Sequence, residues 1–427
     1  MIPFLILSFV ILAIFSVPIA IAVGIAVIVT MAFFSPFPVL GMVQRMVTGI
    51  DSFILLSIPF FMLTGRLMNV GGITDRIFYS ARCLIGHVRG SLAHANVIAS
   101  MIFAGMSGSA VADAGGLGMV EMKAMTDQGY QRDFSAAITV ASSTIGPIIP
   151  PSIPMVIYGA MAEVSVGKLF LAGFLPGALM GLSLMGLVYI MSFKQNMPRD
   201  ELHSLREICR AFLGAFLPLL TPVIIVGGIV GGIFTPTEAA AVAAVYAFVL
   251  SFFVYKTITI RDIPSIIIDT LTTTAVVTFI ISATSGFSWL LIVGKIGKVL
   301  AQLVFSLTRN PLIVLLILNI AMLFLGSLME AGVVLILLVP ILVPMVNALG
   351  IDLVHFGIIM VLNLMIGVAT PPVGMSLFVV SEVSGLRVER LMRAVLPLLI
   401  PLIITLFFVT YFPDFVLLLP RWLMPIQ

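Results

Sequence analysis

The chain has 427 residues, of which 61% are hydrophobic and 9% charged, and its formal net charge is +3. A soluble domain carries about 25% charged residues, so this composition excludes an ordinary soluble protein and predicts contact with a lipid bilayer. The basic residues form no dense patch, which excludes a nucleic-acid-binding surface, so we expect no nucleic-acid partner.

Long apolar stretches follow one another from end to end, interrupted by charges and by proline or glycine. Residues 4–34, 212–234 and 396–412 are long enough, or nearly so, to span a bilayer of roughly 30 Å. The apolar runs are continuous rather than alternating, which excludes a β-barrel. The N-terminus has no basic region and no small-residue cleavage site, so we expect no cleaved signal. The chain is therefore predicted to be an all-α polytopic membrane protein of roughly a dozen helical segments, at about 20 residues a span.

Residues 91–127 are predicted to form a re-entrant hairpin. Its arms would be residues 91–104 and 111–124, joined by a tip at 105–110 that holds two glycines and two serines. Non-helical backbone at membrane depth is tolerated only where it is buried in protein or lines a water-filled cavity. The alternative interpretation is a tight crossing of helices through small residues.

Residues 134–163 are predicted to form a broken helix. Four prolines there remove backbone donors and disrupt carbonyl pairing over two turns, and they are Pro147, Pro150, Pro151 and Pro154. The carbonyl groups of residues 146–149 would then lack helical partners. The alternative is a pair of proline kinks that serve shape alone.

Basic residues mark the loops that we place in the cytoplasm by the positive-inside rule. They form three clusters: Lys194, Arg199, Arg206 and Arg210; Lys256 and Arg261; Arg387, Arg390 and Arg393. The flanks of the first hairpin are basic too, with Arg82, Arg89, Lys123 and Arg132.

The second half of the chain repeats the first at a lag of 221 positions. Residues 145–151 align without a gap with residues 366–372, and Gly105 aligns with Gly326. A shared lag across separate segments predicts two homologous halves, which we place at residues 1–210 and 211–427. The second half would hold a hairpin at 311–349, with its tip at 326–332, and a broken helix at 354–385 in which the carbonyl groups of residues 367–370 are free.

The flanks of the second hairpin are poor in basic residues, so the two halves should have opposite orientations in the membrane. That arrangement is an inverted repeat, and broken helices at matching places in two halves point to the binding site of a secondary transporter. We therefore predict an inverted-repeat secondary transporter with two re-entrant hairpins and two proline-broken helices.

Each half offers oxygen atoms for a small hard cation, because unwound carbonyls and hydroxyls are suitable ligands. The candidate ligands are Ser107, Ser109, Gly146, Ile149 and Pro151 in the first half, and Gly326, Gly367, Thr370 and Pro372 in the second. The half-helices after the breaks would direct positive dipole ends toward an anion between the two sites. The candidate substrate-binding residues are Ser107, Ser109, Ser152, Glu330 and Thr370.

Three carboxylates near these segments have competing interpretations. Glu330 at the second tip either binds substrate or a proton, or caps a helix locally. Asp113 and Glu238 are expected to be helix-start acids, because both follow a predicted helix N-terminus closely.

The absence of certain motifs limits the possible energy sources for transport. The sequence has no G-x-x-x-x-G-K-[ST] phosphate loop and no H-E-x-x-H metal motif, so we expect neither ATP hydrolysis through that loop nor a zinc enzyme. No nucleophile–base or metal constellation is visible, so the chain is not expected to be an enzyme. An ion gradient remains as the driving force.

Four motifs in order resemble those of the large membrane subunit, the DctM-like permease, of TRAP transporters, the tripartite ATP-independent periplasmic transporters. They are GMSGSAVAD at 105–113, GPIIPPS at 146–152, FTPTEAAA at 234–241 and ATPPVG at 369–374, and the resemblance covers essentially the whole chain. It implies an inner-membrane, sodium-coupled importer of an organic acid anion, of the sialic-acid or C4-dicarboxylate class, that works by an elevator motion. It also implies two or more Na⁺ sites and two protein partners, a small four-helix membrane subunit and a periplasmic substrate-binding protein. Within the family the general resemblance favours sialic acid.

Three other functions remain as alternatives. A channel would need a continuous polar pore, whereas two inverted cation sites favour alternating access. A membrane-embedded enzyme would need a catalytic constellation. The nearest alternative is a stand-alone sodium/dicarboxylate symporter with a similar hairpin repeat.

Overall fold

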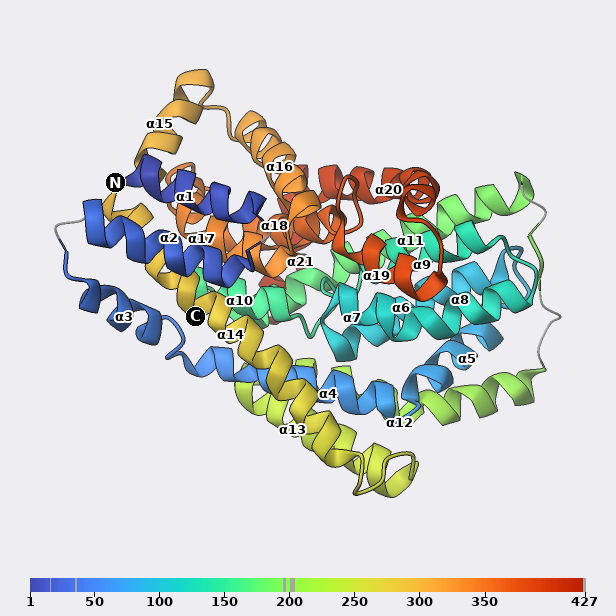
Figure 1. Ribbon diagram of the computed structural model, residues 1–427. Coiled ribbons are helices and arrows are strands. Elements are labelled where there is room, and N and C mark those ends of the chain that lie inside the picture. The colour runs from blue at the N-terminus through green and yellow to red at the C-terminus, as the bar shows by residue number, and fades with distance from the viewer. Residues whose placement is uncertain (16, 35–36, 195–196, 200–203, 425–427) are drawn as a thin grey trace.

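The computed structural model describes residues 1–15, 17–34, 37–194, 197–199 and 204–424. Across these ranges the regular structure is helical and contains no strand (Figure 1). The all-α prediction is therefore confirmed.

The first half of the chain forms eleven α-helices and one 3-10 helix. They are α1 (Ile2–Ile14), α2 (Ile19–Phe34), α3 (Val39–Thr48), η1 (Phe53–Leu56), α4 (Ser57–Val70), α5 (Ile73–Ile85), α6 (Ser91–Ser107), α7 (Ala110–Gly115), α8 (Leu117–Asp127), α9 (Arg132–Ser143), α10 (Ile153–Ala162) and α11 (Val166–Lys194).

The second half forms ten α-helices and one π-helix. They are α12 (Leu205–Val230), α13 (Pro236–Val249), η2 (Leu250–Val254), α14 (Ile263–Val293), α15 (Ile296–Leu307), α16 (Pro311–Leu328), α17 (Ala331–Ala348), α18 (Leu353–Gly367), α19 (Met375–Ser384), α20 (Val388–Tyr411) and α21 (Pro413–Leu423). Among the described residues, eight helices are long and apolar enough to cross a membrane: η1 with α4, α11, α12, α13 with η2, α14, α16, α17 and α20.

Local sequence explains where several helices begin. The α13 helix starts with a capping box in which the Thr235 hydroxyl accepts the backbone N–H of Glu238 at 3.3 Å, and the Glu238 carboxylate accepts the backbone N–H of Thr235 at 2.8 Å. Two otherwise unpaired N–H groups are satisfied in this way. The expectation that Glu238 is a helix-start acid is confirmed.

The helix boundaries repeat at the lag seen in the sequence. Adding 221 to the first residues of α6, α7, α9, α10 and α11 gives the first residues of α16, α17, α18, α19 and α20, to within one residue. The same hairpin, broken helix and long helix therefore occur in the same order in both halves. The division at residues 210 and 211, and the re-entrance of the hairpins into the membrane, remain predictions.

Packing between the halves is reciprocal. The α10 helix packs on α17 of the other half, and the corresponding helix α19 packs on α7. Likewise α9 packs on α20 while α18 packs on α11, and α4 packs on α13 while α2 packs on α14. In each pair of contacts, a helix of one half packs on a helix of the other half, and the two equivalent helices pack on each other in the same way. Such reciprocal contacts are the property of an isologous interface about a two-fold axis. The two halves are thus related by an approximate two-fold rotation.

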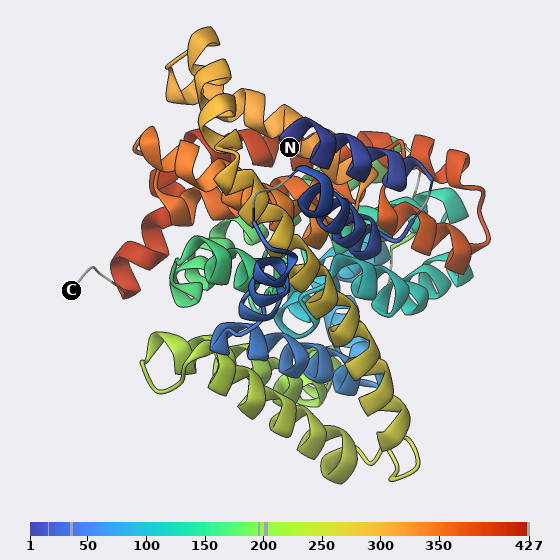
Figure 2. The same ribbon diagram turned by 60° about the vertical axis from the view of Figure 1, so that its left-hand side comes forward.

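The axis passes close to the contact between α11 and α20. There the Thr405 hydroxyl donates to the Ser183 hydroxyl at 3.2 Å, and these two positions lie within one residue of equivalence at the lag of 221. In Figure 1 the hairpins and broken helices lie above α4, α12 and α13, which run along the lower edge, and α14 runs obliquely down to that edge. Figure 2, turned by 60°, shows α13 and α14 on the outside of the hairpins and broken helices.

Candidate functional site

The first hairpin breaks at Gly108 and Ser109, between α6 and α7. Gly108 has a φ of +63°, a left-handed conformation that suits glycine and ends the helix. Ser109 then caps α7, and its hydroxyl oxygen accepts the backbone N–H of Ala112 at 3.4 Å. The break is shorter than the tip predicted at 105–110, because residues 105–107 continue α6. The return arm is also divided, at Gly116, into α7 and α8.

The second hairpin breaks at the matching place, Met329 and Glu330, between α16 and α17. The Glu330 carboxylate accepts the backbone N–H of Val333 at 3.2 Å and so caps α17. Ser109 and Glu330 are 221 positions apart, and so are their bonded residues Ala112 and Val333. The helical cap that the sequence left as one interpretation of Glu330 is therefore present. This break too is shorter than predicted, because α16 continues to Leu328.

The broken helices are interrupted between α9 and α10, at 144–152, and between α18 and α19, at 368–374. The Pro150–Pro151 and Pro371–Pro372 peptide bonds are both cis. Among the described residues, the carbonyl oxygens of Gly146, Ile149 and Pro151 accept no backbone hydrogen bond, as the sequence predicted for the first two.

The second break differs from the prediction that the carbonyls of residues 367–370 are free. The Gly367 carbonyl accepts the N–H of Thr370 at 2.9 Å, and the Val368 carbonyl accepts the N–H of Ser376 at 3.0 Å. Residues 367–370 form a turn, and the first turn of α19 returns to Val368, which brings these donors into reach. A carbonyl oxygen has a second lone pair, so Gly367 keeps one acceptor position. The Thr370 hydroxyl donates to the Ile366 carbonyl at 2.7 Å and likewise keeps acceptor capacity.

In the first half, the hairpin tip lies directly against the break. A Cβ atom on Gly108 would lie 2.9 Å from the Pro151 carbonyl oxygen, and one on Gly105 would lie 3.5 Å from that of Pro150. Ser152 is buried and caps α10 by accepting the N–H of Met155 at 3.2 Å. The predicted ligand Ser107 ends α6, but its side chain lies outside the described part of the structure.

In the second half, the equivalent approach is between two glycine backbones. A Cβ atom on Gly367 would lie 2.7 Å from the carbonyl carbon of Gly326. The N–H of Gly374 donates to the Ser327 carbonyl at 2.9 Å, which ties the second break to the end of α16. Each half thus brings its tip and its break together, with Pro372 in the same loop as Thr370.

A buried carboxylate stands at the first break. Asp113 of α7 is 2% exposed, and a Cβ atom on Gly146 would overlap its Oδ2. The sequence had placed Asp113 as a helix-start acid, which is also true, since it lies in the first turn of α7. Its contact with the break was not foreseen, because it joins residues 33 positions apart. The residue at the matching position of the second half is Val334, so only the first break has a carboxylate at this place.

Two buried polar networks that the sequence analysis missed hold each hairpin to its broken helix. In the first half the Asn96 side-chain NH2 donates to the Thr139 hydroxyl at 2.9 Å, and the Ser142 hydroxyl donates to the Asn96 side-chain oxygen at 2.7 Å. In the second half the Asn363 amide donates to the Asn319 side-chain oxygen at 2.9 Å. Ser142 and Asn363 are 221 positions apart, so the lag could have indicated them.

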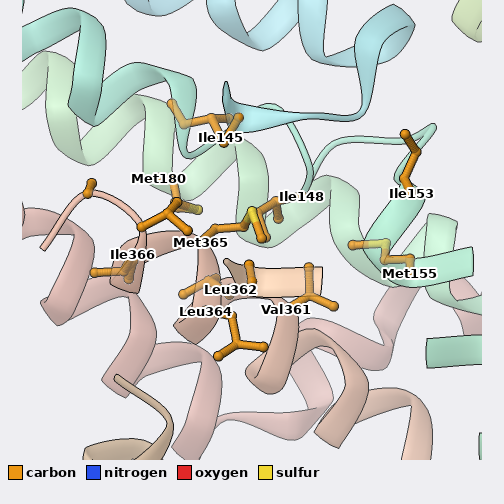
Figure 3. Close-up of a cluster of buried hydrophobic side chains, with 14 of the residues drawn as sticks. Ile145, Ile148, Ile153, Met155, Met180, Val361, Leu362, Leu364, Met365 and Ile366 are labelled. Atoms are coloured by element: carbon orange, nitrogen blue, oxygen red, sulfur yellow. The ribbon is translucent and has the colours of Figure 1, made fainter. Parts of the chain in front are cut away.

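The space between the two broken helices is filled by apolar side chains. Figure 3 shows residues of both halves in one cluster, with Ile145 and Ile148 from the first break facing Met365 and Ile366 from the end of α18. Met180 of α11 joins them. The polar groups of each tip and break therefore lie beside a packed apolar centre.

The sequence profile of one family, described as "Tripartite ATP-independent periplasmic transporter, DctM component", matches residues 6–415. The sialic acid TRAP transporter large permease protein SiaM of Vibrio cholerae is 46% identical over 378 residues, which cover 88% of this chain and 88% of that protein. The C4-dicarboxylate TRAP transporter large permease protein DctM of Pseudomonas aeruginosa is 42% identical over 402 residues, which cover 94% of each.

A solved structure has the same fold at low sequence identity. The YdaH transporter of Alcanivorax borkumensis superposes with a TM-score of 0.62 and 13% identity, over 88% of this chain and 87% of that one. At this identity the similarity shows the fold alone, and it agrees with the predicted class of polytopic transporter.

Proposed function

The chain belongs to the family of the DctM component of tripartite ATP-independent periplasmic transporters, and on that premise we propose that it is the sodium-coupled large permease of an importer of an organic acid anion. It is a transporter rather than an enzyme, and a multi-pass protein of the bacterial inner membrane. The names of its relatives support sialic acid or a C4-dicarboxylate as the substrate class.

The observation that carries the proposal is the paired tip and break in each half. The Pro151 carbonyl oxygen lies beside the first tip, and the Gly146 and Ile149 carbonyls belong to the same break. In the second half Gly367 lies against Gly326 near the end of α16, and Thr370 belongs to the same break. Sodium prefers oxygen ligands, and unwound carbonyls at half-helix ends supply them in secondary transporters. Two such sites related by a two-fold axis support coupling to more than one sodium ion in each cycle.

The substrate anion is proposed to bind near Ser109, Ser152, Glu330 and Thr370, with the side chain of Ser107 as a further candidate. The helices α10 and α19 begin at the breaks, so the positive ends of their dipoles favour a negative charge there. Bound sodium ions would offset the remaining charge. Movement of the hairpins and broken helices as one body, an elevator motion, would then expose the site to each side in turn.

The proposed partners are a small four-helix membrane subunit and a periplasmic substrate-binding protein. The phrase "large permease" in the names of the relatives supports a smaller membrane subunit, and the word "periplasmic" in the family description supports a component outside the membrane. A stand-alone sodium/dicarboxylate symporter is the alternative function, and it would need neither partner.

Uptake by proteoliposomes tests this function. The chain is reconstituted with its small subunit, and substrate is supplied with the binding protein outside. We expect uptake in a sodium gradient, with a Hill coefficient for sodium above one, and only background uptake when choline replaces sodium. Equal uptake in sodium-free buffer with a proton gradient would refute sodium coupling. Equal uptake without the binding protein would favour the stand-alone symporter.

Glu330→Gln tests the substrate site. Glutamine keeps a side-chain oxygen that can accept the Val333 N–H, so the α17 cap is retained while the charge is lost. If Glu330 accepts a hydrogen bond from a substrate hydroxyl, glutamine replaces a charged acceptor with a neutral one and should raise KM about fivefold, since a hydrogen bond to a charged group contributes about 1 kcal/mol more than one to a neutral group. Glu382→Gln, at an exposed position on α19, is the matched control and should transport normally. Unchanged KM in Glu330→Gln would leave only the capping role.

A further inference from the structure

A cavity of about 1390 Å³ lies at one end of the molecule, between α9, α11, α19 and α20. It is separate from the two breaks. Its lining has two parts: a charged part with Asp133, Arg387, Glu389, Arg390 and Arg393, and an apolar part with Phe134, Met191, Leu386, Ala394 and Pro397.

The charged part of the cavity carries an excess of positive charge. Arg390 donates to the Asp133 carboxylate at 2.6 Å, which neutralises that acid and joins α20 to α9. Arg387 and Arg393 form no ion pair within the part of the chain that the structure describes. The guanidinium group of Arg132 lies next to Gly385, which also lines the cavity. The four positive charges of these arginines thus exceed the two negative charges of Asp133 and Glu389.

Two helix N-termini open into the same cavity. The N-cap of α9 is Gln131 and that of α20 is Arg387, and both residues line the cavity. Neither N-cap side chain accepts a hydrogen bond from its own helix. Free N–H groups and the positive ends of two helix dipoles therefore add to the arginines in favouring an anion.

The lining extends from the charged ends of the helices to an apolar residue deeper in the cavity. Along α20 the arginines occupy the first two turns, whereas Pro397 lies ten residues beyond Arg387, about 15 Å farther along the helix axis. Met191 lies near the end of α11, close to Lys194. The positive-inside rule places these helix ends at the cytoplasmic surface. The arginines then lie at the level of lipid phosphates, Ala394 and Met191 lie within one turn of a basic residue, and Pro397 lies at the level of acyl chains.

We propose that this cavity binds one anionic phospholipid from the cytoplasmic leaflet, with its phosphate among Arg387, Arg393 and the two helix N-termini and an acyl chain along Met191, Ala394 and Pro397. Basic pockets between membrane helices on the cytoplasmic side have the chemistry to bind anionic headgroups. A soluble phosphate would use the arginines alone, whereas the apolar lining is suited to a lipid chain. The bound lipid would join α9, α11, α19 and α20, and hence both halves of the repeat.

Native mass spectrometry of the delipidated full chain tests this site. Phosphatidylglycerol is compared with phosphatidylcholine of the same acyl chains, for the wild type and for the double variant Arg387→Gln/Arg393→Gln. We expect preference for phosphatidylglycerol in the wild type and a loss of affinity of about thirtyfold in the double variant, since each arginine near a lipid surface contributes about 1 kcal/mol and each 1.4 kcal/mol is tenfold. The variant Arg387→Lys/Arg393→Lys should keep most of the affinity.

The control Arg206→Gln/Arg261→Gln removes the same charge from exposed cytoplasmic positions outside the cavity and should bind as the wild type. Ala394→Trp fills the apolar part, leaves the arginines in place and should also weaken binding. Equal binding of the two lipids, an equal loss in the control, or unchanged binding in Ala394→Trp would overturn the proposal. Displacement of the lipid by millimolar inorganic phosphate would assign the cavity to a soluble anion instead. All these outcomes are independent of sodium coupling.

Discussion

Gly367→Ala is expected to abolish transport and to destabilise the protein strongly. The new Cβ would lie 2.7 Å from the Gly326 carbonyl carbon and 2.8 Å from its Cα, and backbone atoms cannot move aside as a flexible side chain can. The α16 and α18 helices would have to separate where the Gly374 N–H donates to the Ser327 carbonyl. Overpacking of a tight core costs about 1–3 kcal/mol, occasionally more. Sodium-driven uptake and the midpoint of thermal unfolding measure the two effects.

Gly186→Ala is the matched control, because a Cβ atom there meets nothing within 4 Å and the residue lies inside α11. This variant should unfold at the wild-type temperature or slightly above it, since alanine favours a helix over glycine by about 1 kcal/mol. Wild-type uptake and stability in Gly367→Ala would show that the two backbones do not approach closely, and would remove the geometric basis of the second site.

Asp113→Asn is expected to raise the sodium concentration for half-maximal uptake by tenfold or more. Its carboxylate lies against Gly146, whose carbonyl is a proposed ligand, and it is buried from solvent. Hydrogen bonds and contacts to a charged group contribute about 1.5–3 kcal/mol, or roughly tenfold to a hundredfold in affinity. Asparagine keeps the size of the side chain and removes only the charge. The measurement is uptake against sodium concentration at saturating substrate.

Two variants sharpen this test. Asp127→Asn makes the same chemical change at an exposed position in the same hairpin and should leave the sodium dependence unchanged. Thr370→Ala removes a neutral ligand from the second site, where Val334 replaces the carboxylate, and should have a smaller effect. An effect of Thr370→Ala equal to that of Asp113→Asn would mean that the carboxylate adds nothing to the first site.

Much of the fold could be read from the sequence because helix breaking is a local property. Pro150, Pro151, Pro371 and Pro372 remove backbone donors wherever they stand, so the two breaks and their lag of 221 were predictable. The start of α13 was predictable for the same reason, since Thr235 and Glu238 satisfy each other's backbone within one turn. The extent of the hairpin tips was not predictable from the sequence. The α6 and α16 helices stay helical through Gly105 and Gly326, because tertiary packing there outweighs the weak helix propensity of glycine.

The candidate site was likewise predictable in part from the sequence and in part only from the tertiary structure. Composition, hydropathy and the repeat by themselves determined that this is an all-α membrane transporter in two related halves, and they indicated which segments supply carbonyl and hydroxyl oxygens. Only the tertiary structure decided which groups meet: Asp113 with Gly146, the backbone of Gly326 with that of Gly367, and Asn319 with Asn363. It also decided that arginines of α20 share a cavity with Met191 of α11. The physical reason is that breaks and apolar spans depend on a residue and its neighbours in the chain, whereas these contacts depend on how distant helices pack.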